Sequence, residues 1–563
     1  MEALINPPIE QVEVYIANLD LYKKIPLGLP LKNIADEFEE QLGFKPINVQ
    51  VNHRTQELTW RCYHSVDIEF VGISKESGMR TYERTLSFVM AKALNDLMPS
   101  AKLYIEHALS KGYYCRIDTE QKITEEAIER LKTKMWSLIE RDLPFRLKTE
   151  RTERVAAIFR ERGLIDKAEL IESTGDPYTS YHELDGYPNY FYGCLAPSTG
   201  YIHLFDLIPW MDDGLLLQVP RRDDTSMLQQ PVPQPMMKDV IHKHDKLLDM
   251  THCKYVGSLN GVIDRGRTAT LVQVSEAMQE KEIAGIAADI AKRYQSGVRV
   301  ILISGPSSSG KTTFCKRLQI QLITNYIRPH GLSLDDYFVD RDKTPRDERG
   351  EYDFEDIHAL DLELLGQHIS QILSGEEVSL PSFDFTTGKR VYRGNTIQIK
   401  DGDLLVMEGI HALNPELLPS IPSSATYKIY VSALTNIALD AHNRIPSTDN
   451  RLLRRIVRDY KYRAYSAIDT IRRWPSVRAG EEKWVFPYQE NAHVMFNSAM
   501  VYELAVLKPL AEQILRQVPR NVPEFVEATR LLRFLSYFHY LPMQILPDDS
   551  LLREFVGGSI FDY

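Results

Sequence analysis

Cysteine is scarce in this sequence, and positive charge is outnumbered by negative charge. The 563 residues include five cysteines without any Cys-x-x-Cys pair: Cys62, Cys115, Cys194, Cys253 and Cys315. An odd number of isolated thiols argues against a disulfide scaffold and fits a reducing, cytoplasmic compartment. Lysine and arginine number 67 against 78 acidic residues, a formal net charge of −11. Binding to nucleic acid or anionic lipid would therefore need a local basic patch.

Long apolar runs are also missing. The longest uncharged stretch, Gly186 to Phe205, contains proline, asparagine, serine and threonine and is too polar to cross a bilayer. The first ten residues, MEALINPPIE, lack the basic and apolar regions of a signal peptide, so we expect none. Hydrophobic residues make up 43% and charged residues 26%, which is typical of a globular protein and excludes a mainly disordered chain. We expect a cytoplasmic protein with no membrane partner.

Apolar periodicity and proline content divide the chain into five expected segments. In the first, Leu31, Ile34, Ala35 and Phe38 recur at helical spacing before Gly43, a helix stop. The expected segments are a small α+β unit at 1–72; a mixed unit at 73–222 with helices from Thr81 to Leu97 and from about Thr124 to Arg141; a proline-bearing linker and helical connection at 223–295; an α/β unit at 296–510; and a helical extension at 511–563 whose end, from Ser550 to Tyr563, is irregular.

Short apolar runs alternate with helical stretches in the segment 296–510. Val298–Ile303, Leu404–Met407 and Tyr427–Val431 are nearly continuous apolar runs. Helices cover a parallel sheet from both sides, so its strands are buried on both faces and consist of nearly continuous apolar runs. The pattern therefore predicts a doubly wound α/β sheet.

A glycine-rich loop follows the first of these apolar runs. Residues 305–313 read GPSSSGKTT, a complete G-x-x-x-x-G-K-[ST] pattern that continues into a helical stripe. Glycine lets backbone N–H groups turn inward around phosphate oxygens, and the helix N-terminus adds positive charge. We expect Lys311 to neutralise the β- and γ-phosphates of ATP and Thr312 to offer its hydroxyl to Mg²⁺. The expected nucleotide-binding residues are Gly305, Ser307, Ser308, Ser309, Gly310, Lys311, Thr312 and Thr313.

Acidic residues stand at the ends of two further expected strands. Glu408 follows Leu404–Met407 and suits Mg²⁺ or water binding beside the loop. Asp335 and Asp336 follow a strand expected near 331–334. Ligands bind outside the carboxyl ends of strands in open α/β sheets, where an aspartate can accept the proton of an attacking hydroxyl.

Four arginines share one face of the expected helix from Asn450 to Arg463. Arg451, Arg454, Arg455 and Arg458 lie opposite an apolar face. An exposed row of guanidinium groups suits a lid that closes on transferring phosphate. Without the glycine-rich loop, an ordinary solvated amphipathic helix would be the preferred interpretation.

Over roughly residues 296–510 these motifs together resemble the uridine kinase and phosphoribulokinase branch of P-loop kinases. The resemblance implies that Asp335 is the catalytic base, with Asp336 as the alternative. It further implies ribose binding by Glu355 or Asp356, substrate binding by Phe338, and base binding by the segment from Phe383 to Arg390. The lid residues Arg455, Arg458 and Arg463 would bind phosphate.

The base-reading part departs from that family. Phe383 stands where uridine kinases carry a tyrosine, and Gly388 stands where they carry a histidine that reads the pyrimidine. Tyr465 stands at a position where that family carries a further lid arginine. The phosphoryl-transfer positions therefore match better than the positions that select the base.

The first 220 residues resemble the N-terminal half of threonyl-tRNA synthetase. Residues 10–72 are similar to its ubiquitin-like TGS domain, and residues 73–222 to its editing domain. The histidine and cysteine positions that hydrolyse mischarged tRNA fall on Arg84, Phe88, Cys194 and Ser198, so only the cysteine is kept. A fold without its catalytic side chains implies a binding or structural module. Bacterial uridine kinase-like nucleoside kinases that join the same modules in this order resemble the whole chain.

The sequence as a whole predicts an ATP- and Mg²⁺-dependent kinase that phosphorylates a small hydroxyl acceptor, with the 5′-hydroxyl of a nucleoside as the preferred acceptor. Two alternatives stay open. One is a kinase for another acceptor, such as a sugar phosphate. The other is an RNA-binding regulator whose P-loop only senses ATP. RNA binding by the N-terminal half and assembly into a homo-oligomer also stay open.

Overall fold

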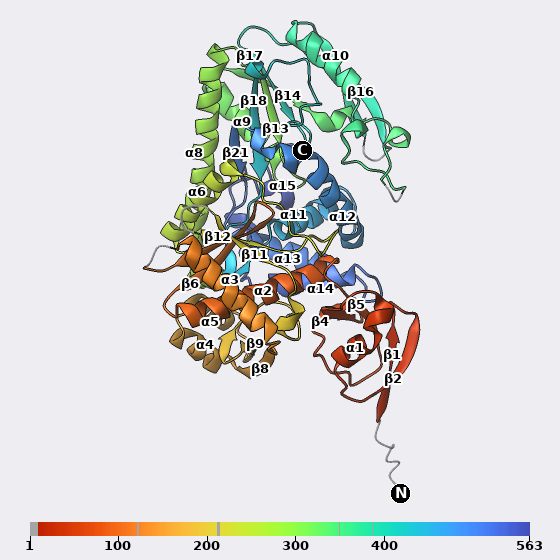
Figure 1. The fold of residues 1–563 in the computed structure, drawn as a ribbon. Helices are drawn as coiled ribbons and strands as arrows, with labels where there is room; N and C mark the ends of the chain where they lie inside the picture. Colours follow the sequence, from red (N-terminus) through yellow and green to blue (C-terminus); the bar gives the residue numbers. More distant parts are fainter. Residues whose placement is uncertain (1–9, 121–122, 211–213, 348–349, 385–386, 563) are drawn as a thin grey trace.

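The computed structural model describes residues 10–120, 123–210, 214–347, 350–384 and 387–562. In Figure 1 the α/β unit occupies the upper part of the molecule, and the two units that precede it in the sequence lie below it. Among the described residues, none of the helices combines the length and the apolar character that a membrane span requires.

The N-terminal unit is a five-stranded sheet with one helix. The strand order is β2-β1-β5-β3-β4, in which β1 and β5 are parallel. Helix α1 buries Leu31, Ile34 and Phe38 in the core of this unit and ends at Gly43, whose φ of 72° is left-handed. The predicted helix and its stop are confirmed. The elements are β1 Gln11–Ile16, β2 Leu21–Pro26, α1 Leu31–Leu42, β3 Asn48–Val51, β4 Arg54–Gln56 and β5 Val66–Val71.

The second unit contains two antiparallel sheets, ordered β11-β12-β7-β6 and β10-β9-β8. Helices α2 and α3 pack on the first sheet in one apolar cluster. Helix α2 starts five residues before the predicted Thr81, and this added turn buries Gly78 and Met79. The elements are α2 Glu76–Leu97, β6 Lys102–Leu109, β7 Gly112–Asp118, α3 Glu125–Glu140, β8 Arg146–Arg151, α4 Thr152–Glu161, α5 Ile165–Ser173, β9 Tyr178–Leu184, β10 Tyr187–Asn189, β11 Asp206–Trp210 and β12 Gly214–Gln218.

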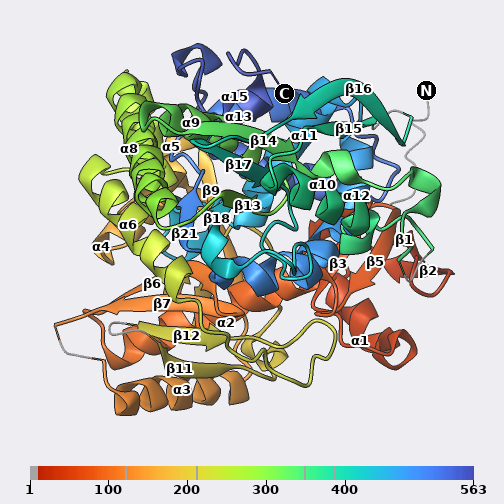
Figure 2. The ribbon, with the colours of Figure 1, turned by 90° about the horizontal axis from the view of Figure 1, so that it is seen from above.

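Three helices connect this unit to the α/β sheet: α6 Pro235–Thr251, α7 Val256–Asp264 and α8 Thr268–Gln295. Pro235 begins α6, where a proline costs no backbone hydrogen bond. Helix α8 runs along one side of the α/β sheet (Figures 1 and 2) and shares a cluster with α9.

The α/β sheet is fully parallel, with the order β14-β17-β13-β18-β21. On β13, Val300 and Leu302 face the cluster that includes α10, whereas Ile301 and Ile303 face the cluster that includes α8 and α9. The predicted doubly wound sheet is confirmed. The elements are β13 Val300–Ser304, α9 Lys311–Thr324, β14 Arg328–Ser333, α10 Leu362–Leu373, β17 Asp403–Glu408, β18 Thr426–Ser432 and β21 Val494–Asn497.

The remaining elements are the edge strand β14, the helices and strands outside the parallel sheet, and the 3-10 turns. Strand β14 starts three residues before the predicted Gly331, because the edge strand begins with the polar segment 328–330. The remaining helices and strands are β15 Val378–Asp384, β16 Lys389–Ile397, β19 Ala438–Asp440, β20 Asn443–Arg444, α11 Ser447–Tyr462, α12 Ala467–Trp484, α13 Glu503–Leu515, α14 Phe525–Leu535 and α15 Arg553–Val556. The 3-10 turns are η1 Thr199–Tyr201, η2 Leu334–Tyr337, η3 Arg341–Lys343, η4 Ile357–Ala359, η5 Ser423–Ala425, η6 Phe486–Asn491 and η7 Met543–Ile545.

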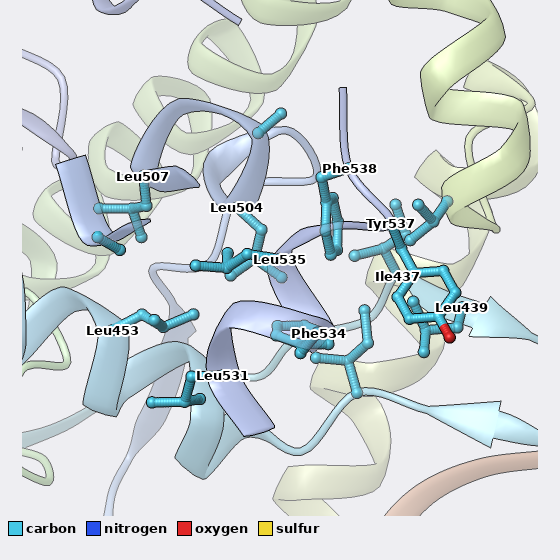
Figure 3. Packing of buried hydrophobic residues seen from close by; sticks show 14 of the residues in the cluster. Ile437, Leu439, Leu453, Leu504, Leu507, Leu531, Phe534, Leu535, Tyr537 and Phe538 are labelled. Atoms are coloured by element: carbon cyan, nitrogen blue, oxygen red, sulfur yellow. The ribbon is translucent and has the colours of Figure 1, made fainter. Parts of the chain in front are cut away.

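The C-terminal extension is part of the largest apolar core. Figure 3 shows Leu453 of α11, Leu504 of α13 and Phe534 of α14 packing together. The same cluster includes residues of α4, α5 and α7, so the second unit and the extension share a core. The predicted irregular tail from Ser550 contains one short helix, α15, and it packs tightly, since Leu552 and Phe555 are fully buried.

Candidate active site

The glycine-rich loop joins β13 to α9 at the carboxyl edge of the sheet. A Cβ atom on Gly305 would lie 2.0 Å from the carbonyl oxygen of Val431, so only glycine fits there. Gly310 has a φ of 82° at the N-terminus of α9, a left-handed conformation that favours glycine. These two glycines explain why the loop can turn its backbone N–H groups inward.

The side chains of this loop fit a phosphate chain and a divalent cation. The hydroxyls of Ser308 and Ser309 are buried and have no hydrogen-bond partner among the described residues. Lys311 Nζ donates to the Pro306 carbonyl at 3.3 Å, which holds its ammonium group over the loop. Thr312 Oγ1 lies 3.4 Å from Glu408 Oε1, a pair of hard oxygen ligands of the kind that Mg²⁺ uses together with phosphates.

Two acidic side chains come from adjacent strand ends. Ser333, the last residue of β14, is in register with Glu408, the last residue of β17, and Asp335 follows two residues later. Burial raises the pKa of Glu408 to about 7, the charges of Asp335 and Glu554 raise it too, and Lys311 opposes them. Asp335, Glu408 and Lys311 therefore share one site.

The neighbouring Asp336 is engaged in holding the β15–β16 hairpin. Its Oδ1 accepts a hydrogen bond from the backbone N–H of Phe383 at 3.1 Å. Burial raises the pKa of Asp336, and the charge of Asp335 adds to this effect. Asp336 also lines a cavity of about 540 Å³ beside Pro381 of the hairpin. The two aspartates thus face different surroundings.

Glu355, which the sequence predicts to bind ribose, lies close to the charged groups at the loop. Burial raises its pKa to about 7; Arg455 opposes this effect, Glu481 and Asp335 add to it, and Lys311 opposes it. A Cβ atom on Gly480 of α12 would lie 2.2 Å from Glu355 Cβ, so α12 holds this side chain in place. The residue predicted to bind ribose therefore lies among the charged side chains around the glycine-rich loop.

Asp356 lies differently from Glu355. Its Oδ1 caps η4 by accepting from the backbone N–H of His358 at 2.9 Å, and it also contacts the His358 ring at 2.9 Å. Burial opposes ionisation of Asp356, but these hydrogen bonds and Lys483 outweigh burial and lower its pKa. Asp356 is thus occupied locally, whereas Glu355 faces the loop.

The predicted base-binding residues gather around the β15–β16 hairpin. The rings of Phe338 and Phe383 lie 5.5 Å apart. Arg390 donates to the Phe338 carbonyl at 3.2 Å and pairs with Asp361 at 3.0 Å. It also lines a second cavity of about 540 Å³ with Lys343 and His358.

Arg341 is a neighbour of Gly388 that the sequence did not indicate. A Cβ atom on Gly388 would lie 2.7 Å from Arg341 Nε, and the Arg341 N–H donates to the Gly388 carbonyl at 2.9 Å. A guanidinium group therefore lies against the position at which the resembled family carries a histidine.

The expectation that all four arginines of α11 form an exposed face is wrong. Arg451 is 3% exposed and Arg454 is fully buried. Arg451 donates to Glu481 Oε2 at 2.8 Å and to the Ser307 carbonyl at 3.1 Å. Arg454 pairs with Glu503 at 2.6 Å and reaches the Ser308 carbonyl at 3.4 Å. These two arginines fix the loop against α11, so α11 is a packed helix.

The three arginines predicted to bind phosphate form a cluster around one carboxylate. Arg455 Nη1 donates to Ser307 Oγ at 2.7 Å, and Arg458 pairs with Asp459 at 2.7 Å. Arg463 lies 3.8 Å from Asp459, and the charge of Arg458, together with burial, lowers the pKa of Arg463 to about 10. Asp459 thus gathers the three guanidinium groups beside the loop.

Two carboxylates that contact the loop were missed by the sequence analysis. Glu481 Oε1 accepts from the Ser307 N–H at 2.9 Å, and Glu554 Oε2 accepts from Thr313 Oγ1 at 2.7 Å. Each stands far along the chain from its partner and within no recognisable motif. Only their position in the folded protein identifies them.

The raised pKa of Glu355 predicts a pH-dependent stability effect. A carboxyl group whose pKa is higher in the folded than in the unfolded state destabilises the fold as pH rises through the interval between the two values, from 4.5 to about 7. Glu355→Gln removes this cost. Its melting temperature should match that of the parent near about pH 5 and exceed it by at least about 2 °C near about pH 8.

Thermal unfolding of both proteins across this pH range tests the effect. Glu363→Gln, which changes an exposed glutamate of α10, is the matched control and should give the same difference at every pH. A constant difference for Glu355→Gln as well would contradict the raised pKa.

Two of the editing positions lie together in the second unit. A Cβ atom on Gly193 would lie 2.7 Å from the guanidinium of Arg84, and Cys194 comes next in the chain. Burial raises the pKa of the Cys194 thiol to about 12. Phe88 is fully buried against Phe145 and Phe191. The editing positions therefore lie in the packed interior of the second unit.

Comparisons with known proteins found relatives for the N-terminal region and for the region around the loop. The N-terminal region matches threonine–tRNA ligase of Desulforamulus reducens at 27% identity over 179 residues, 32% of this chain and 28% of the ligase. The chain thus spans little more than a quarter of that relative. A solved structure described as a possible uridine kinase from Bacillus stearothermophilus aligns with 38% of this chain and 100% of its own at 21% identity and a TM-score of 0.26.

The region around the loop matches a family of kinases. Residues 300–505 match the family described as Phosphoribulokinase / Uridine kinase. Uridine kinase of Lactobacillus helveticus is 30% identical over 179 residues, which cover 31% of this chain and 74% of that enzyme. Through this region, the chain belongs to the phosphoribulokinase / uridine kinase family.

Proposed function

We propose that this protein is an ATP- and Mg²⁺-dependent kinase that transfers the γ-phosphoryl group to the 5′-hydroxyl of a nucleoside. The observation that carries the proposal is the convergence of Lys311, Asp335, Glu408 and the Arg455–Arg458–Arg463 cluster around one glycine-rich loop. Membership of a family of small-molecule kinases supports the phosphoryl transfer, and the resemblance to uridine kinases supports the nucleoside.

Within this proposal the chain's own residues supply positioning and charge. The loop N–H groups and Lys311 hold the phosphates, and Asp335 accepts the proton of the attacking hydroxyl. The arginine cluster stabilises the charge that spreads over the transferring group. Thr312 and Glu408 would hold Mg²⁺, which neutralises phosphate charge when bound.

The acceptor pocket is proposed to hold the sugar more strongly than it selects the base. Glu355 is a half-buried carboxylate at the loop that two vicinal hydroxyls would satisfy. Phe383 can stack on a flat ring, but Gly388 has no side chain that could read a pyrimidine edge. A pocket discriminates strongly only where a buried polar group is left unpaired by the wrong substrate.

A nucleoside panel tests this proposal. We expect kcat/KM for uridine to exceed that for deoxyuridine by about tenfold or more, the cost of an unpaired, half-buried carboxylate, with smaller differences among uridine, cytidine and a purine ribonucleoside. ADP release with each acceptor is the measurement. Equal rates for uridine and deoxyuridine would remove the ribose role from Glu355. Activity on a sugar phosphate alone would show that the protein is a kinase for that other class of acceptor. ATP binding without turnover would show that the P-loop only senses ATP.

We also propose that the N-terminal half is a structural module. The five expected segments, 1–72, 73–222, 223–295, 296–510 and 511–563, are proposed as the domains of the chain. Its core positions at Arg84 and Phe88 replace editing histidines, and Lys167 of α5 forms a fully buried ion pair with Asp440 of β19 at 2.7 Å. Such a pair fixes one unit against the other, since separating it would leave a buried charge uncompensated. We place the protein in the cytoplasm because its five cysteines are all unpaired and buried.

A further inference from the structure

The C-terminal segment 546–557 packs against the glycine-rich loop and α11. Leu551 and Phe555 are fully buried, and a Cβ atom on Gly310 would lie 3.3 Å from Leu551 Cδ2. The guanidinium of Arg454 stacks over the Phe555 ring at 5.0 Å, and Lys461 Nζ donates to the Val556 carbonyl at 2.8 Å. The end of the chain is therefore packed between the loop and α11.

This segment places a carboxylate on the N-terminus of α9. Glu554 Oε2 accepts from Thr313 Oγ1 at 2.7 Å and from the Thr313 backbone N–H at 3.3 Å. Thr313 is the third residue of α9, and its N–H is one of the four that have no partner within the helix. These first-turn N–H groups are the donors that such a loop offers to phosphate, so Glu554 occupies part of the phosphate cradle.

The charges around the cradle make this occupation incompatible with a bound polyphosphate. Asp335 and Glu554 both raise the pKa of Glu408, whereas Lys311 lowers it, so three carboxylates crowd one ammonium group. Mg²⁺ at Thr312 and Glu408 would offset part of this charge, but Glu554 bonds to Thr313, on donors that the phosphates themselves need. A phosphate oxygen and the Glu554 carboxylate cannot both accept from these donors.

Glu554 cannot simply rotate out of the cradle. The residue is 9% exposed, and its neighbours Arg553 and Phe555 are buried. Arg553 donates to the carbonyls of Leu546 and Gly557, which makes 546–557 a closed local unit. Removing the carboxylate from Thr313 therefore requires the segment to shift as a whole.

We propose that Glu554 is an internal competitor for the phosphates of the donor nucleotide, and that segment 546–557 is a plug that leaves the cradle when the nucleotide binds. The inference rests on the proposed function, since it takes the loop to bind MgATP. The resting protein then binds its donor more weakly than the empty cradle would, because each binding event must first displace the plug.

Binding of MgATP to the full chain, followed by calorimetry, tests the plug without requiring turnover. Glu554→Gln keeps the side-chain shape but removes the charge, and Glu554→Ala removes the acceptor altogether. We expect the Kd for MgATP to fall about tenfold in both variants, the scale of one charge-assisted hydrogen bond. Asp562→Asn, an exposed acid at the same end of the chain, is the matched control and should bind as the parent does.

A second measurement follows the segment itself. Hydrogen exchange of residues 546–557 in the parent should quicken when MgATP saturates the protein. Variants that melt as the parent does but bind MgATP with unchanged or weaker affinity would overturn the plug, as would unchanged or slower exchange. If neither the parent nor the variants bind MgATP more tightly than Lys311→Ala, the proposed function fails together with the plug; equal binding by parent and variants defeats the plug alone.

Discussion

Replacing Lys311 by alanine should lower turnover by at least about a hundredfold, the scale of losing a principal electrostatic stabiliser of the transition state. Lys311 is the ammonium group held over the loop, where its charge acts on both Glu408 and Glu355. The α9 helix should still form, because alanine favours helix at this first position. ADP release at saturating acceptor is the measurement.

A second lysine of the same helix provides the control. Lys316 lies on α9 five residues beyond Lys311 and outside the loop, so Lys316→Ala should keep near-normal turnover. Near-normal turnover of a Lys311→Ala protein that melts as the parent does would reject the assignment of the loop as a phosphate site. The protein would then belong to the kinase family without using this loop for phosphoryl transfer.

Local patterns account for the parts of the site that could be predicted. The loop needs glycine at 305 and 310 for reasons of space and backbone conformation, and the adjoining strands are apolar on both faces because helices cover both sides. These constraints act within about ten residues of chain, so periodicity and spacing reveal them. The doubly wound sheet followed from the same signals.

The partners of the arginines could not be predicted, because they come from distant segments. The pattern of α11 shows an arginine face, and its amphipathic period is the same whether that face meets water or carboxylates. Arg451 meets Glu481 of α12, and Arg454 meets Glu503 of α13. A buried guanidinium with a matched carboxylate looks in sequence like ordinary surface charge, since only tertiary packing removes the water.

The contact between the C-terminal segment and the loop could not be predicted either, because its two partners lie even farther apart in the sequence. Thr313 and Glu554 are 241 residues apart, and neither the length nor the polarity of the last fourteen residues indicates a contact with the loop. Leu551, Leu552 and Phe555 are fully buried, so this stretch, which is irregular apart from the four residues of α15, packs as part of the core.

Replacing Asp335 by asparagine should lower kcat by at least about a hundredfold while the Kd for MgATP changes by less than about threefold. Asparagine keeps the shape of the side chain but cannot accept the proton of the acceptor hydroxyl. Asp335 is the member of the pair whose charge acts on Glu408, Glu355 and Arg463, so it lies among the charged residues at the glycine-rich loop. Single-turnover phosphoryl transfer with uridine separates this loss from any change in product release.

Asp336→Asn is the matched control, one residue away and with the same change of charge. Asp336 accepts from the Phe383 N–H through Oδ1, and the amide oxygen of asparagine can accept the same hydrogen bond, so the hairpin should stay in place. Its kcat should stay within about threefold of the parent. If Asp336→Asn abolishes turnover and Asp335→Asn does not, the base is Asp336, and the hydroxyl acceptor must then reach the cavity beside the β15–β16 hairpin instead of the space between Lys311 and Glu355.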